Sequence, residues 1–226
     1  MRLGFALKRM ASWAAPKSIV VRGRSEFPYA VGVTFDDGPH AENTPRILDS
    51  LDEKGAHATF FMQGDAAEKN SALVREVIDR GHQIANHGYA HTDAKVVSAR
   101  MYVADVMRCQ AVLEDIAGSA LPRDFRPPYG SVALASTIAL LRRDFRFVFW
   151  SLDSCDSFLP DAELIVEHVT AQEISAGSIL LFHDDYAHTV AALPRVLGHL
   201  RDRAFEIASL DSLLSCRERQ VSGRTV

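Results

Sequence analysis

The chain has 226 residues, of which 47% are apolar and 24% are charged, and its formal net charge is −4. This composition is typical of a globular domain and excludes a disordered or collagen-like chain. The net negative charge argues against a general nucleic-acid-binding protein, because such proteins use Lys and Arg to neutralise phosphates.

Residues 1–16 combine early positive charge with hydrophobic side chains at helical spacing. Their longest apolar run, Leu3 to Leu7, is shorter than a secretory signal requires, and no stretch of the chain approaches the roughly 20 apolar residues of a membrane span. We favour a short helix packed on the domain; the alternative is peripheral contact with an anionic membrane surface. The three cysteines show no paired spacing and fit a reducing compartment, so we expect a cytoplasmic protein.

From residue 29 onward, short β-rich runs alternate with helical patterns, which is typical of β/α units around a parallel sheet. Strands are predicted at 29–35, 57–62, 82–85, 123–126, 145–151, 178–182 and 204–208. Helices are predicted from Thr44, as N-cap, and at 65–80, 95–117, 131–143, 161–175, 190–202 and 209–215. Without a glycine-rich nucleotide fingerprint, this alternation predicts an α/β fold, a (β/α)7-8 barrel that is either complete or incomplete. We expect an N-terminal extension over 1–28, the barrel over 29–215 and a tail over 216–226.

Unusual polar residues follow five of the predicted strands. They lie at Asp36 and Asp37, at His87 and His91, and within 126–130, 150–156 and 183–185. Because parallel strands of a barrel bring their carboxyl ends to one face, where catalytic residues gather, we expect these five segments to form one site.

His87 and His91 have a spacing that suits a metal site. One helical turn would bring their Cβ atoms within about 6 Å, although Gly88 makes a regular helix there uncertain. An added aspartate would complete a His-His-carboxylate set that leaves positions open for water and substrate, with zinc as the default ion. Asp93 could orient a ligand, but an exposed turn aspartate is the favoured interpretation.

The adjacent carboxylates Asp36 and Asp37 point to the same chemistry. They repel each other unless cations lie nearby, and Gly38 and Pro39 predict a turn that presents them away from the sheet. One could bind the ion while the other accepts a proton from metal-bound water. An Asx-type turn, bonded only to local amides, is given equal weight.

Five ordered segments resemble the motifs of the polysaccharide deacetylases, the NodB-homology enzymes of carbohydrate esterase family four. They are TFDDGP at 34–39, NHGYAH at 86–91, RPPY at 126–129, WSLDSCD at 150–156 and ILLFH at 179–183. The resemblance spans about residues 29–210. It implies a distorted β/α barrel and a bound divalent cation, Zn²⁺ or another such as Co²⁺, Ni²⁺ or Mn²⁺. It also implies metal-dependent hydrolysis of N-acetyl groups on amino sugars, in which the bond that breaks is a carbon–nitrogen bond outside any peptide.

The resemblance also implies roles for single residues. Asp36 matches the general base, and the metal ligands would be Asp37, His87 and His91. His183 matches the general acid.

Further positions match residues that support this chemistry. Arg126 matches the arginine that holds the base, and Asp156 the aspartate that supports the acid. Tyr129 matches the residue whose backbone N–H faces the developing oxyanion. Pro128 and Trp150 are assigned to the substrate side, although core packing is favoured for Trp150. The six remaining histidines, including His188, are expected to be surface or packed residues.

Two positions depart from the family pattern. Gly88 stands where Ser or Thr is usual, so we expect a looser metal loop that lacks a hydroxyl bond. Ser157 stands where Trp is usual, which removes an aromatic wall that Trp150 or Phe158 could replace.

The substrate expected from the resemblance is an acetylated oligosaccharide or polysaccharide, with no nucleic acid as a partner. A sugar O-acetyl esterase and an amino-sugar N-deformylase would use the same mechanism. The alternative from another class is a catalytically silent carbohydrate-binding domain.

Overall fold

The computed structural model describes residues 19–20 and 29–214. The predicted amphipathic segment at 1–16 and the predicted tail at 216–226 lie outside the described residues. Within the described part of the chain, no helix is long and apolar enough to cross a membrane.

The fold is built on one curved sheet of parallel strands. The strands are β1 (Ile19–Val20), β2 (Ala30–Asp36), β3 (Thr59–Met62), β4 (Gln83–Asn86), β5 (Asp124–Phe125), β6 (Arg146–Val148), β7 (Leu152–Asp153), β8 (Ile179–His183) and β9 (Glu206–Ala208). They follow the order β1-β6-β5-β4-β3-β2-β8-β7, and β9 also pairs with β2. Among the described strands no pairing joins β7 to β1, so the barrel is incomplete. The predicted fold class is therefore confirmed.

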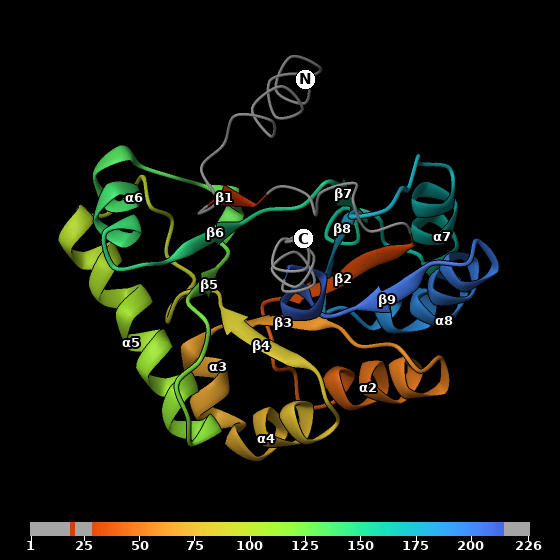
Figure 1. The fold of residues 1–226 in the computed structure, drawn as a ribbon, viewed down its shortest axis with the longest axis horizontal. Helices are drawn as coiled ribbons and strands as arrows, with labels where there is room; N and C mark the ends of the chain where they lie inside the picture. The colour runs from red at the N-terminus through yellow and green to blue at the C-terminus, as the bar shows by residue number, and fades with distance from the viewer. Residues whose placement is uncertain (1–18, 21–28, 215–226) are drawn as a thin grey trace, which may run out of the picture.

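Helices surround the outside of this sheet (Figure 1). They are α2 (Asn43–Glu53), α3 (Gly64–Lys69), α4 (Ser71–Asp79), α5 (Ala99–Ala117), α6 (Leu134–Leu141), α7 (Ala162–Thr170) and α8 (Ala187–Asp202), with the 3-10 turn η1 (Pro128–Gly130). Helix α5 begins where Ser98 Oγ accepts a hydrogen bond from the Met101 N–H, and it ends at Gly118 with a φ of 68°. These are the N-cap and C-cap chemistries expected of serine and glycine.

Two helix predictions are wrong in detail. The helix predicted at 65–80 is split into α3 and α4 at Asn70, whose Nδ2 donates to the Ala66 carbonyl. Such side-chain bonds to nearby backbone compete with helix continuation. Thr44 is not the N-cap of α2; Glu42 is, and Thr44 Oγ1 instead donates to Asp184 at 2.6 Å. The hydroxyl that the local pattern assigned to capping therefore makes a tertiary hydrogen bond instead.

Two short strands were not predicted. Strand β7 follows the strand predicted at 145–151, of which only Arg146–Val148 is paired as β6. Strand β1 lies within the segment assigned to an N-terminal extension, and Ile19 and Val20 pair with Phe147 and Val148 of β6. At two residues each, neither strand carries a detectable alternation of apolar and polar side chains.

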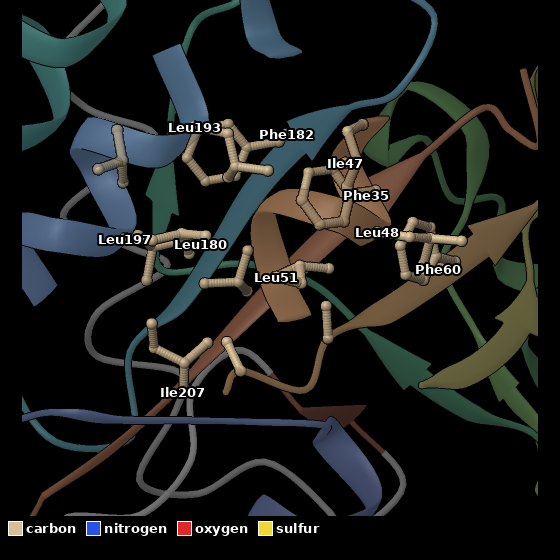
Figure 2. Packing of buried hydrophobic residues seen from close by; sticks show 14 of the residues in the cluster. Phe35, Ile47, Leu48, Leu51, Phe60, Leu180, Phe182, Leu193, Leu197 and Ile207 are labelled. Carbon is tan, nitrogen blue, oxygen red and sulfur yellow. The ribbon is translucent and has the colours of Figure 1, made fainter. Parts of the chain in front are cut away.

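The main core fills the space between the sheet and helices α2 and α8. Figure 2 shows Ile47, Leu48 and Leu51 of α2 and Leu193 and Leu197 of α8 packed beside side chains of the central strands. The rings of Phe35 and Phe60 stack with centroids 5.0 Å apart, and Phe182 lies 5.9 Å from Phe35. A shift of one residue in β2, β3 or β8 would turn these side chains away from α2 and α8, so their burial fixes the strand register.

The strand register determines which predicted motifs become neighbours. Asp36, the last residue of β2, is paired with His183, the last residue of β8. On the other side, Met62 of β3 is paired with Asn86 of β4, and Asn86 with Phe125 of β5. Because all these strands are parallel, the residues that follow them emerge at one edge of the sheet.

Candidate metal centre and active site

Asp37, His87 and His91 converge at the carboxyl edge of the sheet. Asp37 Oδ1 lies 3.5 Å from His87 Nε2 and 3.1 Å from His91 Nε2. The three potential ligand atoms all lie within 4.8 Å of one another. One carboxylate and two imidazoles at this spacing can hold a single divalent cation and leave other coordination positions open.

The protonation of these imidazoles fits a cation. His87 Nδ1 lies 2.8 Å from the Arg126 carbonyl, which can only accept, so in the neutral ring Nδ1 carries the proton and Nε2 offers a lone pair. That Nε2 faces Asp37 and, at 3.8 Å, Asp36 Oδ2. The lone pair of Nε2 and the two carboxylates repel one another, and a bound cation would remove this repulsion. Burial lowers the pKa of His91 against the opposing charge of Asp37, which favours its neutral, ligating form.

The two histidines lie on a loop and not on a helical turn. Gly88 has a φ of 80° and His91 a φ of 50°, both left-handed. Among the described residues, Asp93 has no hydrogen bond or ion pair with either imidazole; its Oδ1 accepts hydrogen bonds from Ser131 Oγ at 2.6 Å and from the Lys95 N–H at 2.9 Å. The turn interpretation of Asp93 is the one that the contacts support.

Asp36 is held by a fully buried arginine. Arg126 is 0% exposed and Asp36 is 3% exposed, and Arg126 Nη1 donates to Asp36 Oδ1 at 2.6 Å and to Thr34 Oγ1 at 2.8 Å. Nε and Nη2 donate to the Val148 and Phe149 carbonyls at 3.2 and 3.3 Å. The guanidinium is thus anchored to β2 and to the end of β6, and it fixes one oxygen of Asp36 while leaving Oδ2 directed toward His87 Nε2.

Asp37 also has a partner from another strand. Gln63, the residue after β3, donates its Nε2–H to Asp37 Oδ1 at 2.8 Å. Among the described residues, the side-chain partners of Asp36 and Asp37 come from distant segments and not from local amides, which contradicts the Asx-turn alternative. Gln63 was missed by the sequence analysis, although its position directly after a predicted strand is a signal that could have indicated it.

The half-buried His183 pairs with the buried carboxylate of Asp156. His183 Nδ1 lies 2.7 Å from Asp156 Oδ1, and the His183 N–H and Thr189 Oγ1 each donate to Asp156 Oδ2 at 2.8 Å. Burial opposes protonation, but the hydrogen bond and charge of Asp156 raise the pKa of His183 to about 9. Burial likewise opposes ionisation of Asp156, yet the bonds from His183 hold its pKa below the ordinary value. The pair therefore favours a protonated imidazole at neutral pH.

His188, expected to be an ordinary surface or packed histidine, lies beside this pair. Its Nε2 is 2.8 Å from the Asp156 carbonyl, and its ring stacks on Tyr186 with centroids 5.1 Å apart. The Tyr186 ring in turn stands edge-on to His183 at 6.0 Å. No spacing in the sequence indicated these contacts, because they depend on how the chain turns between β8 and α8.

The residues assigned to the substrate side occupy η1 and its neighbourhood. Tyr129 has a φ of 58° and is 70% exposed, and its ring stands edge-on to His91 with centroids 4.5 Å apart. Pro128 is buried. Trp150 packs partly against the core, and a Cβ on Gly130 would lie 3.0 Å from its ring. The favoured core packing of Trp150 therefore agrees with its contacts.

The position next to Asp156 carries no large aromatic side chain. Ser157 is exposed there, and Phe158, one residue on, is 82% exposed. The Phe158 N–H donates to the Cys155 carbonyl at 2.9 Å in a tight turn. Of the two residues considered as replacements for the aromatic wall, Trp150 is packed beside η1 and Phe158 is directed to solvent.

Comparison with known proteins identifies the family. The family model described as polysaccharide deacetylase matches residues 26–147. A peptidoglycan-N-acetylglucosamine deacetylase of Bacillus cereus is 33% identical over 187 residues, covering 81% of this chain and 67% of the relative. A chitooligosaccharide deacetylase of Sinorhizobium fredii is 34% identical over 194 residues, covering 80% of this chain and 90% of the relative.

A solved structure agrees with these matches. The crystal structure of the Bc1960 peptidoglycan N-acetylglucosamine deacetylase superposes with a TM-score of 0.83 at 31% identity, covering 90% of this chain and 96% of that one. The family model spans more than half of the chain, and the motifs that suggested the resemblance lie together at one edge of the sheet. The chain belongs to the polysaccharide deacetylase family.

Proposed function

We propose that the protein is a metal-dependent deacetylase that hydrolyses N-acetyl groups of glucosamine units in an oligosaccharide or polysaccharide. The observation that carries the proposal is the convergence of Asp37, His87 and His91 beside a buried carboxylate, Asp36. The relatives named for peptidoglycan and chitooligosaccharides share N-acetylglucosamine as the acetylated unit, and this supports the substrate class.

The geometry suits hydrolysis by an acid and a base on separate elements. A divalent cation held by the three ligands, zinc by default, would polarise the acetyl carbonyl and lower the pKa of water. Asp36 Oδ2 is the free oxygen of the base, because Oδ1 is occupied by Arg126, and it would take the proton from water. The backbone N–H of Tyr129 would stabilise the developing oxyanion, a contribution of about 3 kcal/mol for one such donor.

His183 would complete the reaction as the acid. Its Nδ1 is bonded to Asp156, which leaves the Nε2 proton for the departing amine nitrogen. The raised pKa of His183, to about 9, keeps this proton in place near neutral pH. Breaking the carbon–nitrogen bond then yields acetate and a free amine.

The test measures acetate release from N-acetylglucosamine oligomers together with metal content. A chelator should abolish release and added zinc should restore it. Asp36→Asn should abolish turnover and keep the metal, whereas His87→Ala should lose the metal. His57→Ala is the matched control, because this exposed histidine precedes β3 at the opposite edge of the sheet, and it should change neither quantity.

Other outcomes would assign a different function. Release only from O-acetylated sugars would indicate an esterase, and release of formate would indicate a deformylase. Glycan binding without release of any acyl group, with zinc bound, would indicate a catalytically silent carbohydrate-binding domain. Equal activity of Asp36→Asn and the unaltered protein would refute the assignment of the base.

A further inference from the structure

Asp105 binds the loop that carries the two histidines. It lies in the second turn of α5, and its carboxylate accepts two backbone hydrogen bonds from the loop. The Tyr89 N–H donates to Oδ2 at 2.8 Å, and the Ala90 N–H donates to Oδ1 at 3.1 Å. One side chain therefore holds two consecutive peptide N–H groups of the segment between His87 and His91.

The opposite side of the same loop is bonded to the first turn of α3. The Gly64 N–H donates to the Gly88 carbonyl at 2.9 Å, and the Asp65 N–H donates to the Tyr89 carbonyl at 3.1 Å. The Gly88 N–H donates to Asn86 Oδ1 at 2.9 Å. The loop is thus fixed from α3, α5 and β4, and the looser loop expected from the glycine is not what the contacts show.

The absence of a side chain at Gly88 leaves room for the Asp105 carboxylate. Gly88 has a φ of 80°, which disfavours any residue with a Cβ, and an added Cβ would lie 3.0 Å from Asp105 Oδ2. The Ser or Thr usual at this position would therefore be strained and would crowd the carboxylate. In this chain, which has no hydroxyl at position 88, a carboxylate from a neighbouring helix holds the loop.

We propose that Asp105 is a positioning residue for the metal centre. By fixing the peptide groups of Tyr89 and Ala90, it holds the His87 and His91 imidazoles at the separation that a single cation requires. Without Asp105 the loop would have to be ordered again each time the cation binds, so affinity would fall. Residues that hydrogen-bond metal ligands directly typically contribute 10–100-fold to metal affinity, and we take this range as the expected size of the effect of Asp105. The inference rests on the proposed metal site.

The experiment measures zinc affinity of the metal-free full chain by competition with a chromophoric chelator, without substrate. Asp105→Asn keeps the size of the side chain but presents an N–H₂ group to one of the two donors; it should weaken zinc binding by about 10–100-fold. Asp115→Asn, which alters an exposed carboxylate on the same helix, is the matched control and should leave the affinity unchanged. The weakening should persist at high salt, because it arises from positioning and not from long-range charge.

A second variant disturbs the same contact without changing Asp105, in case Asp105→Asn fails to fold. Gly88→Ala removes no charge or hydrogen bond, but it strains a left-handed backbone position and crowds Asp105 Oδ2, so it should also weaken zinc binding. Combined with Asp105→Ala, it should cost less than the product of the two separate fold-changes, since truncating Asp105 relieves the crowding. The absorption spectrum of bound Co²⁺ should change in Asp105→Asn, because the spectrum reports the ligand geometry.

Two results separate failure of this inference from failure of the proposed function. If Asp105→Asn binds zinc as tightly as the unaltered protein while His87→Ala does not, the positioning role is overturned and the metal site stands. If His87→Ala also binds zinc unchanged, the metal site itself is wrong. Independent effects of Gly88→Ala and Asp105→Ala would likewise overturn the coupling.

Discussion

The buried pair of Arg126 and Asp36 allows a sharp prediction about stability. Arg126→Met keeps much of the side-chain volume and removes the guanidinium. It leaves the Asp36 carboxylate, which is only 3% exposed, without its cation. It also removes the donor from the Val148 and Phe149 carbonyls. The altered protein should therefore keep its packing but contain an unpaired buried charge.

The expected loss follows from this environment. Removing one partner of a buried ion pair typically costs about 3–5 kcal/mol, because the remaining charge is desolvated without compensation. We expect Arg126→Met to lower the free energy of unfolding by about that amount. Adding Asp36→Leu removes the stranded charge, so the double variant should regain about 2 kcal/mol, although the carbonyl partners stay lost.

Urea unfolding of the metal-free protein, followed by circular dichroism, measures these differences. The chelator must be present throughout, so that altered metal binding does not contribute. Arg195→Met, which removes an exposed cation paired with Glu163, is the control and should have little effect. A loss for Arg126→Met no greater than for Arg195→Met, or no recovery in the double variant, would refute the role of burial.

Three further predictions concern protonation and metal binding. Asp156→Asn should lower the pKa of His183 from about 9, because burial then acts without the opposing carboxylate; an NMR titration of metal-free protein that still gives about 9 would contradict the assigned cause. Burial raises the pKa of Asp184 to about 7 from an ordinary 3.8. Between these pH values the folded protein binds the proton more tightly than the unfolded chain, so the free energy of unfolding should fall as pH rises. Asp184→Asn should make the measured free energy of unfolding less dependent on pH over this range. Free zinc at one hundred times its Kd should raise the free energy of unfolding by about 2.7 kcal/mol, and this gain should be absent in His87→Ala; an equal gain in both proteins would place the zinc elsewhere.

Long periodic segments were predictable from the sequence. The strand that ends in Asp36 and the helix that ends at Gly118 are strongly apolar or strongly capped, and the structure has both within a few residues of the predicted positions. The break at Asn70 was not predictable from periodicity, because the apolar stripe continues across it. Thr44 was assigned to capping because the local pattern does not show its actual partner, Asp184, which is 140 residues away.

The candidate site divides in a similar way. The sequence analysis named the residues that converge, because each follows a strand directly and the strands are parallel. It did not find Gln63 or His188, which contact Asp37 and Asp156. Asp105 also escaped notice, since one aspartate on a long helix has no distinctive local pattern. These residues reach the site through the packing of loops on neighbouring helices.

The amino-acid order alone determined the alternation of strands and helices, and with it the edge at which the polar motifs emerge, because side-chain periodicity and strand direction are local properties. Only the tertiary structure decided which oxygen of Asp36 is occupied by Arg126, which nitrogen of His87 carries the proton, and how a glycine loop is held by a carboxylate from α5. Those features depend on distances between segments far apart in the chain, because a hydrogen bond forms only at about 3 Å between donor and acceptor, and the interaction of two charges weakens as they separate.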